Sequence, residues 1–380
     1  MFKPNNWDEL SFNQFFESVG AKKYQIQKQD YLEEGSIPVV DQGQKKIAGF
    51  TENNDKILDV GDGVIVFGDH TRIVKYIDFN FAVGADGTQI LKTKEGINLK
   101  FAYYQLLNKQ IPNMGYSRHF KFVKEKKYYL PKKIEEQEEI VKVLDDAADM
   151  VRLRKECIDH TEDLTPAIFY QMFGDPSSNE KGWQTCSFKD VAKIDRKNIS
   201  ASDIQGNTYS YIGLEHIEKD TGKILVNSEE TQNIEIKSNK FYFTNEHILY
   251  GKLRPYLNKV ALPEFNGVCS TDIFPILPKY ENKISNRFFV KYLMSSKYFV
   301  NSANSLTAGA NLPRIGTAAL EQIKVFKPDF DLQEEFAKIA KEIEDYKKQQ
   351  YQELKYAEDL FQSLLQKAFT GELTSKVYGG

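Results

Sequence analysis

The sequence predicts an α+β protein in which two similar α/β globules alternate with two long helices that pack on each other. Two observations predict this arrangement. A helical segment recurs late in the chain at constant spacing, and a series of weaker matches upstream of it recurs at slowly rising spacing. A third observation, the distribution of charge, separates the helices from the globules.

The composition is that of a folded chain long enough for two domains. Its 380 residues are 41% hydrophobic and 28% charged, which argues against a disordered protein. No apolar run approaches the roughly 18–20 residues that a membrane helix needs, so we expect no membrane partner and no secretory leader. The three cysteines lack C-x-x-C spacing, which indicates reduced thiols in the cytoplasm and no zinc site.

The first globule is expected at 1–131, and its motifs return in the second globule at 177–328. Strand-like runs broken by Gly, Asn and Asp fill both globules. The spacing of the matches only rises along the chain, which is typical of two copies whose loops gain residues while the core does not. The matches are Trp7 with Trp183, Ser11-Phe12 with Ser187-Phe188, 64–68 with 248–251, Asp86 with Asp272, and Asn98-x-x-Phe101 with Asn286-x-x-Phe289.

Two spacer helices are predicted at 132–176 and 329–373, followed by a tail at 374–380. A constant offset of 196 residues suits one uninterrupted helix, because an inserted residue would rotate the buried face. We expect Pro166 to kink the first helix near Glu162. The matching segments are 137–139 with 333–335, 162–164 with 358–360, and Phe173 with Phe369.

Apolar residues on a 3.5-residue repeat predict that the two helices bury a coiled-coil seam. The alternative is that they are ordinary core helices of an α/β protein. The seam positions are Ile140, Leu144, Ala147, Val151, Ile158, Ile168 and Met172, and then Phe336, Ala340, Ile343, Lys347, Leu354, Leu364 and Ala368.

The helices are acidic and the remainder is basic. Residues 132–175 carry 12 acidic and 6 basic side chains, and residues 329–373 carry 11 and 6. Because the whole chain has a net charge of −3, the rest of it carries +8. A basic surface attracts phosphate, which favours a nucleic-acid partner.

Loops that follow the predicted strands carry the side chains that read base edges, namely Arg and Lys for guanine and Asn and Gln for adenine. They differ between the two globules, which suits readers of different sequences; the alternative is that they are ordinary polar loops, with His70 and His119 as satisfied surface histidines. The candidate DNA-binding residues are Gln42, His70, Thr71, Arg72, Lys75, Tyr116, Arg118 and His119 in the first globule, and Lys252, Arg254, Tyr256, Asn258, Asn311 and Arg314 in the second.

Several motifs resemble the DNA-specificity subunit of type I restriction–modification enzymes. The closing Lys-Ala-Phe-Thr-Gly-Glu-Leu at 367–373 and the Tyr-Gly-Lys-Leu-Arg-Pro-Tyr-Leu at 250–257 are similar to that family, and the segments at 68–72 and 81–88 look like one subgroup of its target-recognition domains. The resemblance implies two target-recognition domains, each of which reads half of a split site on double-stranded DNA. It also implies that the long helices run antiparallel with pseudo-twofold symmetry.

The same resemblance implies the partners. The helices would set the spacing between half-sites and dock two modification (methyltransferase) subunits, which hold S-adenosylmethionine and methylate adenine, and restriction subunits would join that core. No methyltransferase motif, glycine-rich cofactor loop or Walker loop occurs in this chain, so we expect a non-catalytic subunit without cofactor or metal. The alternatives are a coiled-coil scaffold between two protein partners and an enzyme with an unrecognised site.

Overall fold

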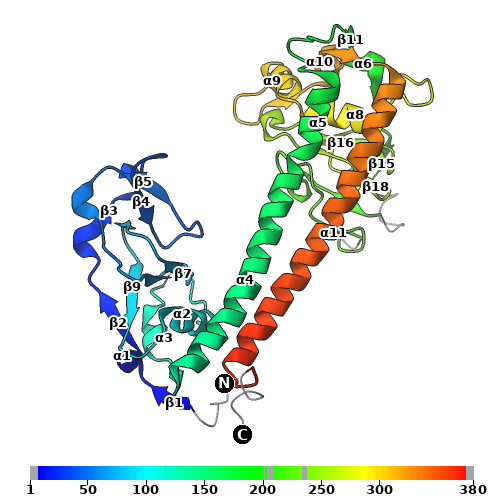
Figure 1. The fold of residues 1–380 in the computed structure, drawn as a ribbon. Helices are drawn as coiled ribbons and strands as arrows, with labels where there is room; N and C mark the ends of the chain where they lie inside the picture. Colours follow the sequence, from blue (N-terminus) through cyan, green and yellow to red (C-terminus); the bar gives the residue numbers. More distant parts are fainter. Residues whose placement is uncertain (1–6, 116, 201, 203–208, 233–237, 374–380) are drawn as a thin grey trace. The chain divides into compact units, whose positions relative to one another are not determined.

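The computed structural model describes residues 7–115, 117–200, 202, 209–232 and 238–373 (Figure 1). The chain divides into two compact units, Met1–Lys155 with Glu353–Gly380 (unit 1) and Glu156–Gln352 (unit 2). Each unit therefore contains one globule and a piece of both long helices. Among the residues described, no helix combines the length and apolar character that crossing a bilayer requires.

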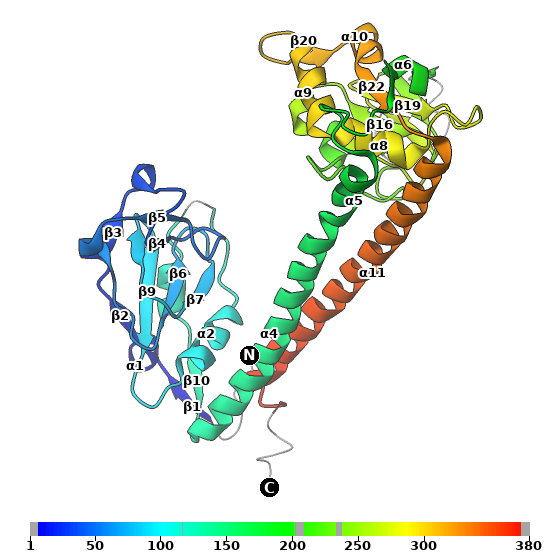
Figure 2. The ribbon, with the colours of Figure 1, turned by 45° about the horizontal axis from the view of Figure 1, so that its top comes forward.

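Unit 1 is built on two four-stranded sheets and a terminal strand pair. One sheet has the order β2-β9-β6-β7, and its strands lie side by side in Figure 2. The other has the order β3-β8-β4-β5, and β1 pairs with β10. The strands are β1 Trp7–Leu10, β2 Phe16–Val19, β3 Gln25–Ile26, β4 Ile37–Val40, β5 Gly49–Thr51, β6 Val64–Gly68, β7 Val74–Ile77, β8 Ala82–Gly84, β9 Thr88–Thr93 and β10 Tyr128–Pro131.

Helices close the unit 1 globule around an aromatic core. Phe101 of α2 packs on Trp7 with ring centroids 5.8 Å apart and on Phe369 at 5.4 Å. The helices are α1 Phe12–Phe15, α2 Leu99–Leu107 and α3 Phe120–Lys124, with short 3₁₀ turns at η1 Lys22–Tyr24, η2 Lys28–Asp30 and η3 Asn54–Lys56.

Unit 2 repeats the strand order of the first sheet but not that of the second. The order β12-β19-β16-β17 matches β2-β9-β6-β7 strand for strand, whereas the other sheet has the order β13-β15-β18-β14. In unit 1 the central β8 has two parallel neighbours, but β18 has one parallel and one antiparallel neighbour. The strands are β11 Gln184–Ser187, β12 Ala192–Ile194, β13 Asn198–Ile199, β14 Tyr211–Ile212, β15 Lys240–Phe243, β16 Ile248–Gly251, β17 Val260–Ala261, β18 Gly267–Cys269, β19 Ile273–Pro278, β20 Thr307–Ala308, β21 Arg314–Ile315 and β22 Lys324–Lys327.

The repeat predicted from the sequence is therefore confirmed for the first sheet and its helices. Capping boxes start the first short helix of each unit, at Ser11 and at Ser187. The helices of unit 2 are α6 Phe188–Val191, α8 Arg287–Ser295, α9 Lys297–Ser305 and α10 Thr317–Gln322, with η4 Leu214–His216 and η5 Pro255–Leu257.

The long helices run antiparallel within each unit. They are α4 Ile134–Glu162, α5 Leu164–Phe173 and α11 Phe330–Ala368. In unit 1, Leu144 shares a core with Leu365, while further along α4 Arg154 pairs with Glu353 at 2.5 Å. In unit 2, the Tyr351 hydroxyl donates to Glu162 at 2.6 Å, and Phe173 packs against Phe336 with centroids 5.4 Å apart.

The break near Glu162 is confirmed, because α4 ends there and α5 begins at Leu164. The seam prediction is confirmed where the long helices meet, and the seam also contacts the globules. Ile140 and Leu144 share one core with Leu365 of α11 and with the first globule. Phe336 and Ala340 share another with Phe173 of α5 and with the second globule. A heptad pattern shows that a helix face is apolar, but it does not show whether another helix or a sheet covers that face. The five-segment division of the chain stays a prediction.

The repeated Gln-Glu-Glu motif now has a physical explanation. Gln137 is buried at the start of α4; its Oε1 accepts from the Asn98 backbone N–H at 2.8 Å and its Nε2 donates to the Gly96 carbonyl at 3.2 Å. Gln333 in α11 does the same to Asn286 at 2.9 Å and Ile284 at 3.2 Å. Asn98 and Asn286 are the N-caps of α2 and α8. One buried amide thus ties each long helix to the N-terminus of a short helix.

We predict that Gln137→Met and Gln333→Met each lower the free energy of unfolding by about 1–3 kcal/mol, because a buried N–H and carbonyl lose their partners. Urea unfolding followed by tryptophan fluorescence would measure this, since Trp7 reports on unit 1 and Trp183 on unit 2. The exposed neighbour Glu138→Met is the control and should change stability by less than about 0.5 kcal/mol. Equal effects of the Gln and Glu substitutions would show that the buried amide does not stabilise the junction between the long and the short helix.

Candidate nucleic-acid interface

Four segments of unit 1 meet at one end of the β2-β9-β6-β7 sheet, which we call the central sheet, as we do its counterpart β12-β19-β16-β17 in unit 2. They are the loop after β4, the β6–β7 turn, the β8–β9 turn and the segment before α3. The side-chain amide of Gln42 joins three of them: its Oε1 accepts from the backbone N–H of His70 at 3.0 Å, and its Nε2 donates to the carbonyl of Asp86 at 3.2 Å. The Thr71 hydroxyl donates to the carbonyl of Gln42 at 2.6 Å. We call this group of loops cluster 1.

Asp69 ties the fourth segment to cluster 1. Its carboxylate accepts from the backbone N–H of Phe120 at 2.8 Å, and its carbonyl accepts from that of His119 at 2.9 Å. The His119 ring is fully buried; its Nδ1 lies 2.9 Å from the Asp69 carbonyl and its Nε2 accepts from Met114 at 3.1 Å. Both ring nitrogens of His119 are therefore occupied within the protein.

Lys75 is also turned inward. Its Nζ donates to the carbonyls of Asp41 at 2.8 Å and Lys45 at 2.6 Å, and its side chain is 7% exposed. Burial lowers the pKa of Lys75, and the Asp41 carboxylate opposes that shift. This arrangement holds the loop after β4 against β7.

The remaining candidates of cluster 1 reach the surface. Thr71 and Arg118 are exposed, and His70 and Arg72 are half-buried. The Arg72 guanidinium donates to the Ile111 carbonyl at 3.3 Å. Tyr116 lies outside the described residues.

Unit 2 forms the corresponding group of loops, cluster 2, at the end of β16. The backbone N–H of Arg254 donates to the Pro313 carbonyl at 2.7 Å, and that of Ile315 donates to Lys252 at 3.1 Å. These bonds join the loop after β16 to the β20–β21 hairpin. Asn258 ends η5 and donates from its amide to the Ser295 carbonyl at 3.2 Å.

Asp272 organises the charges of cluster 2. Its two carboxylate oxygens accept from Nε and Nη2 of Arg314 at 2.9 and 3.1 Å, and Lys252 Nζ lies 4.0 Å away. The hydrogen bond from Arg314 lowers the pKa of the Asp272 carboxyl. Lys252 also lies over the Phe274 ring, 5.1 Å from its centroid. By contrast, Arg254, Tyr256 and Asn311 are exposed.

Both clusters contain an arginine with left-handed backbone geometry. Arg72 has φ 62° and Arg254 has φ 52°, and each follows the matching strand, β6 or β16. Asp86 (φ 49°) and Asn258 (φ 47°) lie in the same clusters. A left-handed conformation costs an arginine roughly 1–2 kcal/mol, and such strain concentrates at functional sites. Among the described residues, no group of three or more His, Cys, Asp or Glu could hold a metal ion.

The two globules match one known sequence family twice. The profile of the type I restriction modification DNA specificity domain covers residues 4–160 and again 180–356. The chain belongs to this family. Each copy of the domain contains one loop cluster with its left-handed arginine.

Individual relatives agree with this assignment. The type I restriction enzyme EcoDI specificity subunit of Escherichia coli is 31% identical over 198 residues, which are 51% of this chain and 43% of the relative. The matched segment thus spans less than half the length of that relative. The fold is similar to a crystal structure of a type I restriction–modification system S subunit from M. genitalium, with a TM-score of 0.59, 17% identity and 96% of each chain covered. A second structure, from work on complex assembly and conformational transition of the type I R-M system, gives a TM-score of 0.55 at 14% identity and covers 98% of this chain and 100% of that one.

Sequence reasoning missed the aspartates that hold the clusters. Asp41, Asp69 and Asp272 each bind a lysine, an arginine or a backbone N–H across 30 or more residues of chain, and no local pattern reveals such a pair. One signal was available, because Asp86 and Asp272 match in the repeat. Asp86 lies in the turn before β9 and Asp272 in the turn before β19, and these two strands hold the same place in the two matching sheets.

We predict that Arg254→Gly is more stable than Arg254→Ala by about 1 kcal/mol, because glycine alone accepts a left-handed backbone without strain. The control is Tyr256, whose side chain is 50% exposed and whose φ is not among the positive ones. There glycine should be no more stable than alanine. Thermal unfolding of the four variants checks the reversal, and the same order at both positions would contradict it.

Proposed function

We propose that the chain is the sequence-specific DNA-binding subunit of a type I restriction–modification complex and that each globule reads one half of a bipartite site. The observation that carries the proposal is the pairing of each copy of the specificity domain with one cluster of polar loops around a left-handed arginine. Arginine binds the O6 and N7 of guanine with two hydrogen bonds, which is the commonest specific contact in the major groove.

Within this proposal the candidate residues take different roles. Arg254, Tyr256 and Asn311 are the exposed groups of cluster 2 and are proposed to contact DNA directly. Lys75 and His119 are proposed to hold their loops in place, because their polar atoms bond within the protein. Arg314 is proposed to hold the β20–β21 hairpin in place, because its guanidinium bonds to Asp272. The remaining candidates, Gln42, His70, Thr71, Arg72, Tyr116, Arg118, Lys252 and Asn258, stay proposed DNA-binding residues.

The differing second sheets support two different half-sites. The central sheets share one strand order, but the sheets that carry β4 and β18 do not. The loop after β4 enters cluster 1, and the turn after β18 contains Asp272 of cluster 2. A rebuilt second sheet therefore changes the chemistry beside each arginine while the scaffold stays constant.

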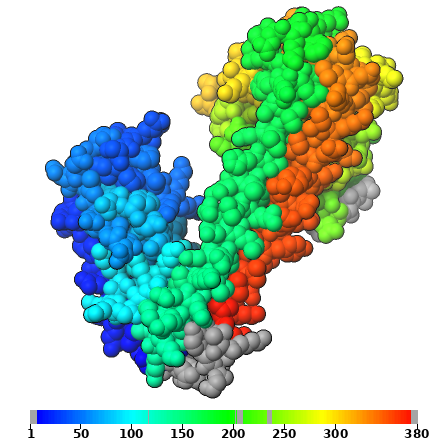
Figure 3. All heavy atoms as spheres, in the orientation of Figure 1, coloured from blue at the N-terminus to red at the C-terminus, as the bar shows by residue number. Residues whose placement is uncertain are grey.

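The long helices are proposed to set the spacing between half-sites and to dock two modification subunits. In unit 1, large apolar side chains stand exposed on both helices, including Met150 (45%), Leu153 (51%) and Tyr356 (71%). One face of α4, in green, is uncovered in the space-filling view (Figure 3). Exposed apolar side chains on neighbouring turns mark protein interfaces.

We therefore propose that this chain is a non-catalytic subunit acting in the cytoplasm. The modification subunits would hold S-adenosylmethionine and methylate adenine, and restriction subunits would join them. A pure coiled-coil scaffold would instead show no base preference on DNA.

We predict that Arg254→Gly relaxes base preference in one half-site only, and that Arg72→Gly does so in the other, by about 1–3 kcal/mol each. The glycine variants keep the backbone relaxed, so the loss belongs to the side chain. Sequencing of methylated adenines after co-expression with the modification subunits measures the preference. Lys22→Met, an exposed lysine away from cluster 1, is the charge control. Equal weakening of both half-sites would assign the arginine to phosphate contact.

We predict that Met150→Ala with Leu153→Ala weakens binding of a modification subunit at least tenfold, because truncating buried interface anchors costs more than about 1 kcal/mol. Asp146→Ala with Glu139→Ala, on the same helix, is the matched control. Titration of labelled chain with modification subunit measures the affinity. Unchanged affinity of the Met150 and Leu153 variant would exclude this face as the docking surface.

A further inference from the structure

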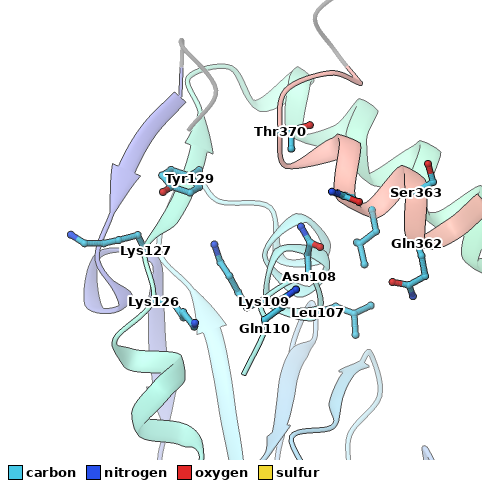
Figure 4. Close-up of a pocket in the computed structure, with 12 residues that line it drawn as sticks. Leu107, Asn108, Lys109, Gln110, Lys126, Lys127, Tyr129, Gln362, Ser363 and Thr370 are labelled. Atoms are coloured by element: carbon cyan, nitrogen blue, oxygen red, sulfur yellow. The ribbon is translucent and has the colours of Figure 1, made fainter. Parts of the chain in front are cut away.

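A cavity of about 990 Å³ lies within unit 1, between the end of α2, the strand β10 and the end of α11. Figure 4 shows its lining: Lys109, Lys126 and Tyr129 lie on the globule side, and Gln362 and Ser363 lie on α11. It is separate from the atoms that form cluster 1. Cavities of this size accommodate ligands larger than a single inorganic ion.

The lining is basic, and two of its three lysines have no carboxylate partner among the described residues. None of the described residues that line the cavity is Asp or Glu. Lys127 pairs with Glu9 at 3.3 Å, but among the described residues no carboxylate pairs with Lys109 or Lys126. Burial, reinforced by the charge of Lys126, lowers the pKa of Lys109 to about 8. A desolvated ammonium beside a second one is costly unless an anion joins them.

Neutral donors complete the site. Asn108 Nδ2 is buried and has no hydrogen-bond partner among the described residues, which is uncommon in folded proteins. Gln362, Ser363 and Gln366 add amide and hydroxyl donors from the α11 side. The ammonium of Lys109 lies 5.3 Å from the centroid of the Tyr128 ring and 5.1 Å from that of Tyr129, and both rings attract it.

We propose that this cavity binds a phosphate-bearing anion, with Lys109 and Lys126 as its cationic contacts and Asn108 as a neutral donor. Phosphate oxygens accept several charge-assisted hydrogen bonds at once, which matches two ammonium groups and an unused amide. A single carboxylate would leave most of the volume empty. The ligand is either a free polyphosphate or nucleotide, or a backbone phosphate of bound DNA.

The alternative in which the ligand is a DNA phosphate rests on the proposed function. The cavity is linked to cluster 1, because the Arg72 guanidinium donates to the carbonyl of Ile111, two residues beyond Lys109. A phosphate held in the cavity would then fix the segment that supports Arg72. The free-anion source requires no DNA binding at all, so the two are separable.

The test is calorimetric titration of the full chain with inorganic tripolyphosphate. We expect saturable one-to-one binding that Lys109→Met and Lys126→Met each weaken at least tenfold, while Lys22→Met changes it less than twofold. Both cavity variants should fold, since Met has a side chain of similar length to Lys and, at Lys109, removes the burial cost of a desolvated ammonium. Loss of binding in all three variants, or no saturable binding, overturns the proposal, as does tighter binding of a polyglutamate peptide than of tripolyphosphate.

Two further arms identify the source and the proton linkage. A duplex that displaces tripolyphosphate identifies the DNA backbone as the source of the phosphate; a duplex that binds without displacing it identifies a free anion.

Because the pKa of free Lys109 is about 8, the affinity for tripolyphosphate should fall as pH rises from 7 to 9, by up to about tenfold per pH unit above that pKa. Lys126, Lys127, Tyr128 and Tyr129 are the other titratable groups nearby, so the comparison is with Lys109→Met. An equal pH dependence in that variant would remove Lys109 from the site. Failure of DNA binding alone would leave the tripolyphosphate result intact.

Discussion

The architecture depends on one buried side-chain amide at the start of each long helix. A helix N-terminus leaves backbone N–H groups without partners, and a glutamine offers an acceptor and a donor on one rigid group. Gln137 and Gln333 use both to fasten α2 and α8. The short helices pack against the central sheets. Within each unit, the glutamine therefore fixes the direction of the long helix relative to the central sheet.

This constraint leaves the loop end of each sheet free to vary. The buried glutamine and the central sheet recur in both units. The second sheet differs between the units in its strand order and in the parallel or antiparallel sense of its pairs. Loops that follow strands of the second sheet lie beside Arg72 and Arg254. A change in the second sheet therefore alters the neighbours of each arginine without disturbing the attachment of the long helix. The left-handed backbone at these two positions is what remains common to both clusters.

The long helices, the break at Asp163 and the repeat could be predicted because each depends on spacing along the chain. The roles of Lys75 and His119 could not. They are held inward by Asp41 and Asp69, which lie 34 and 50 residues away. The composition of a loop does not indicate contacts between residues so far apart in the chain. The seam could be predicted as an apolar helix face, but not everything that covers it could. Ile140 and Phe336 pack against the globules as well as against the other long helix, and an apolar period does not identify each surface that covers it.

Charge shows the same distinction between composition and placement. The excess positive charge outside the long helices favours nucleic acid, but only unpaired cations are free to meet a phosphate or a base. Arg314 already gives two hydrogen bonds to Asp272, and a ligand would have to compete with that carboxylate. Its bidentate bond instead fixes the hairpin that supports Arg254 through Pro313. Arg254 has no such carboxylate among the described residues and stands exposed at the strand end. We therefore propose that the paired Arg314 positions the hairpin and that Arg254 contacts DNA.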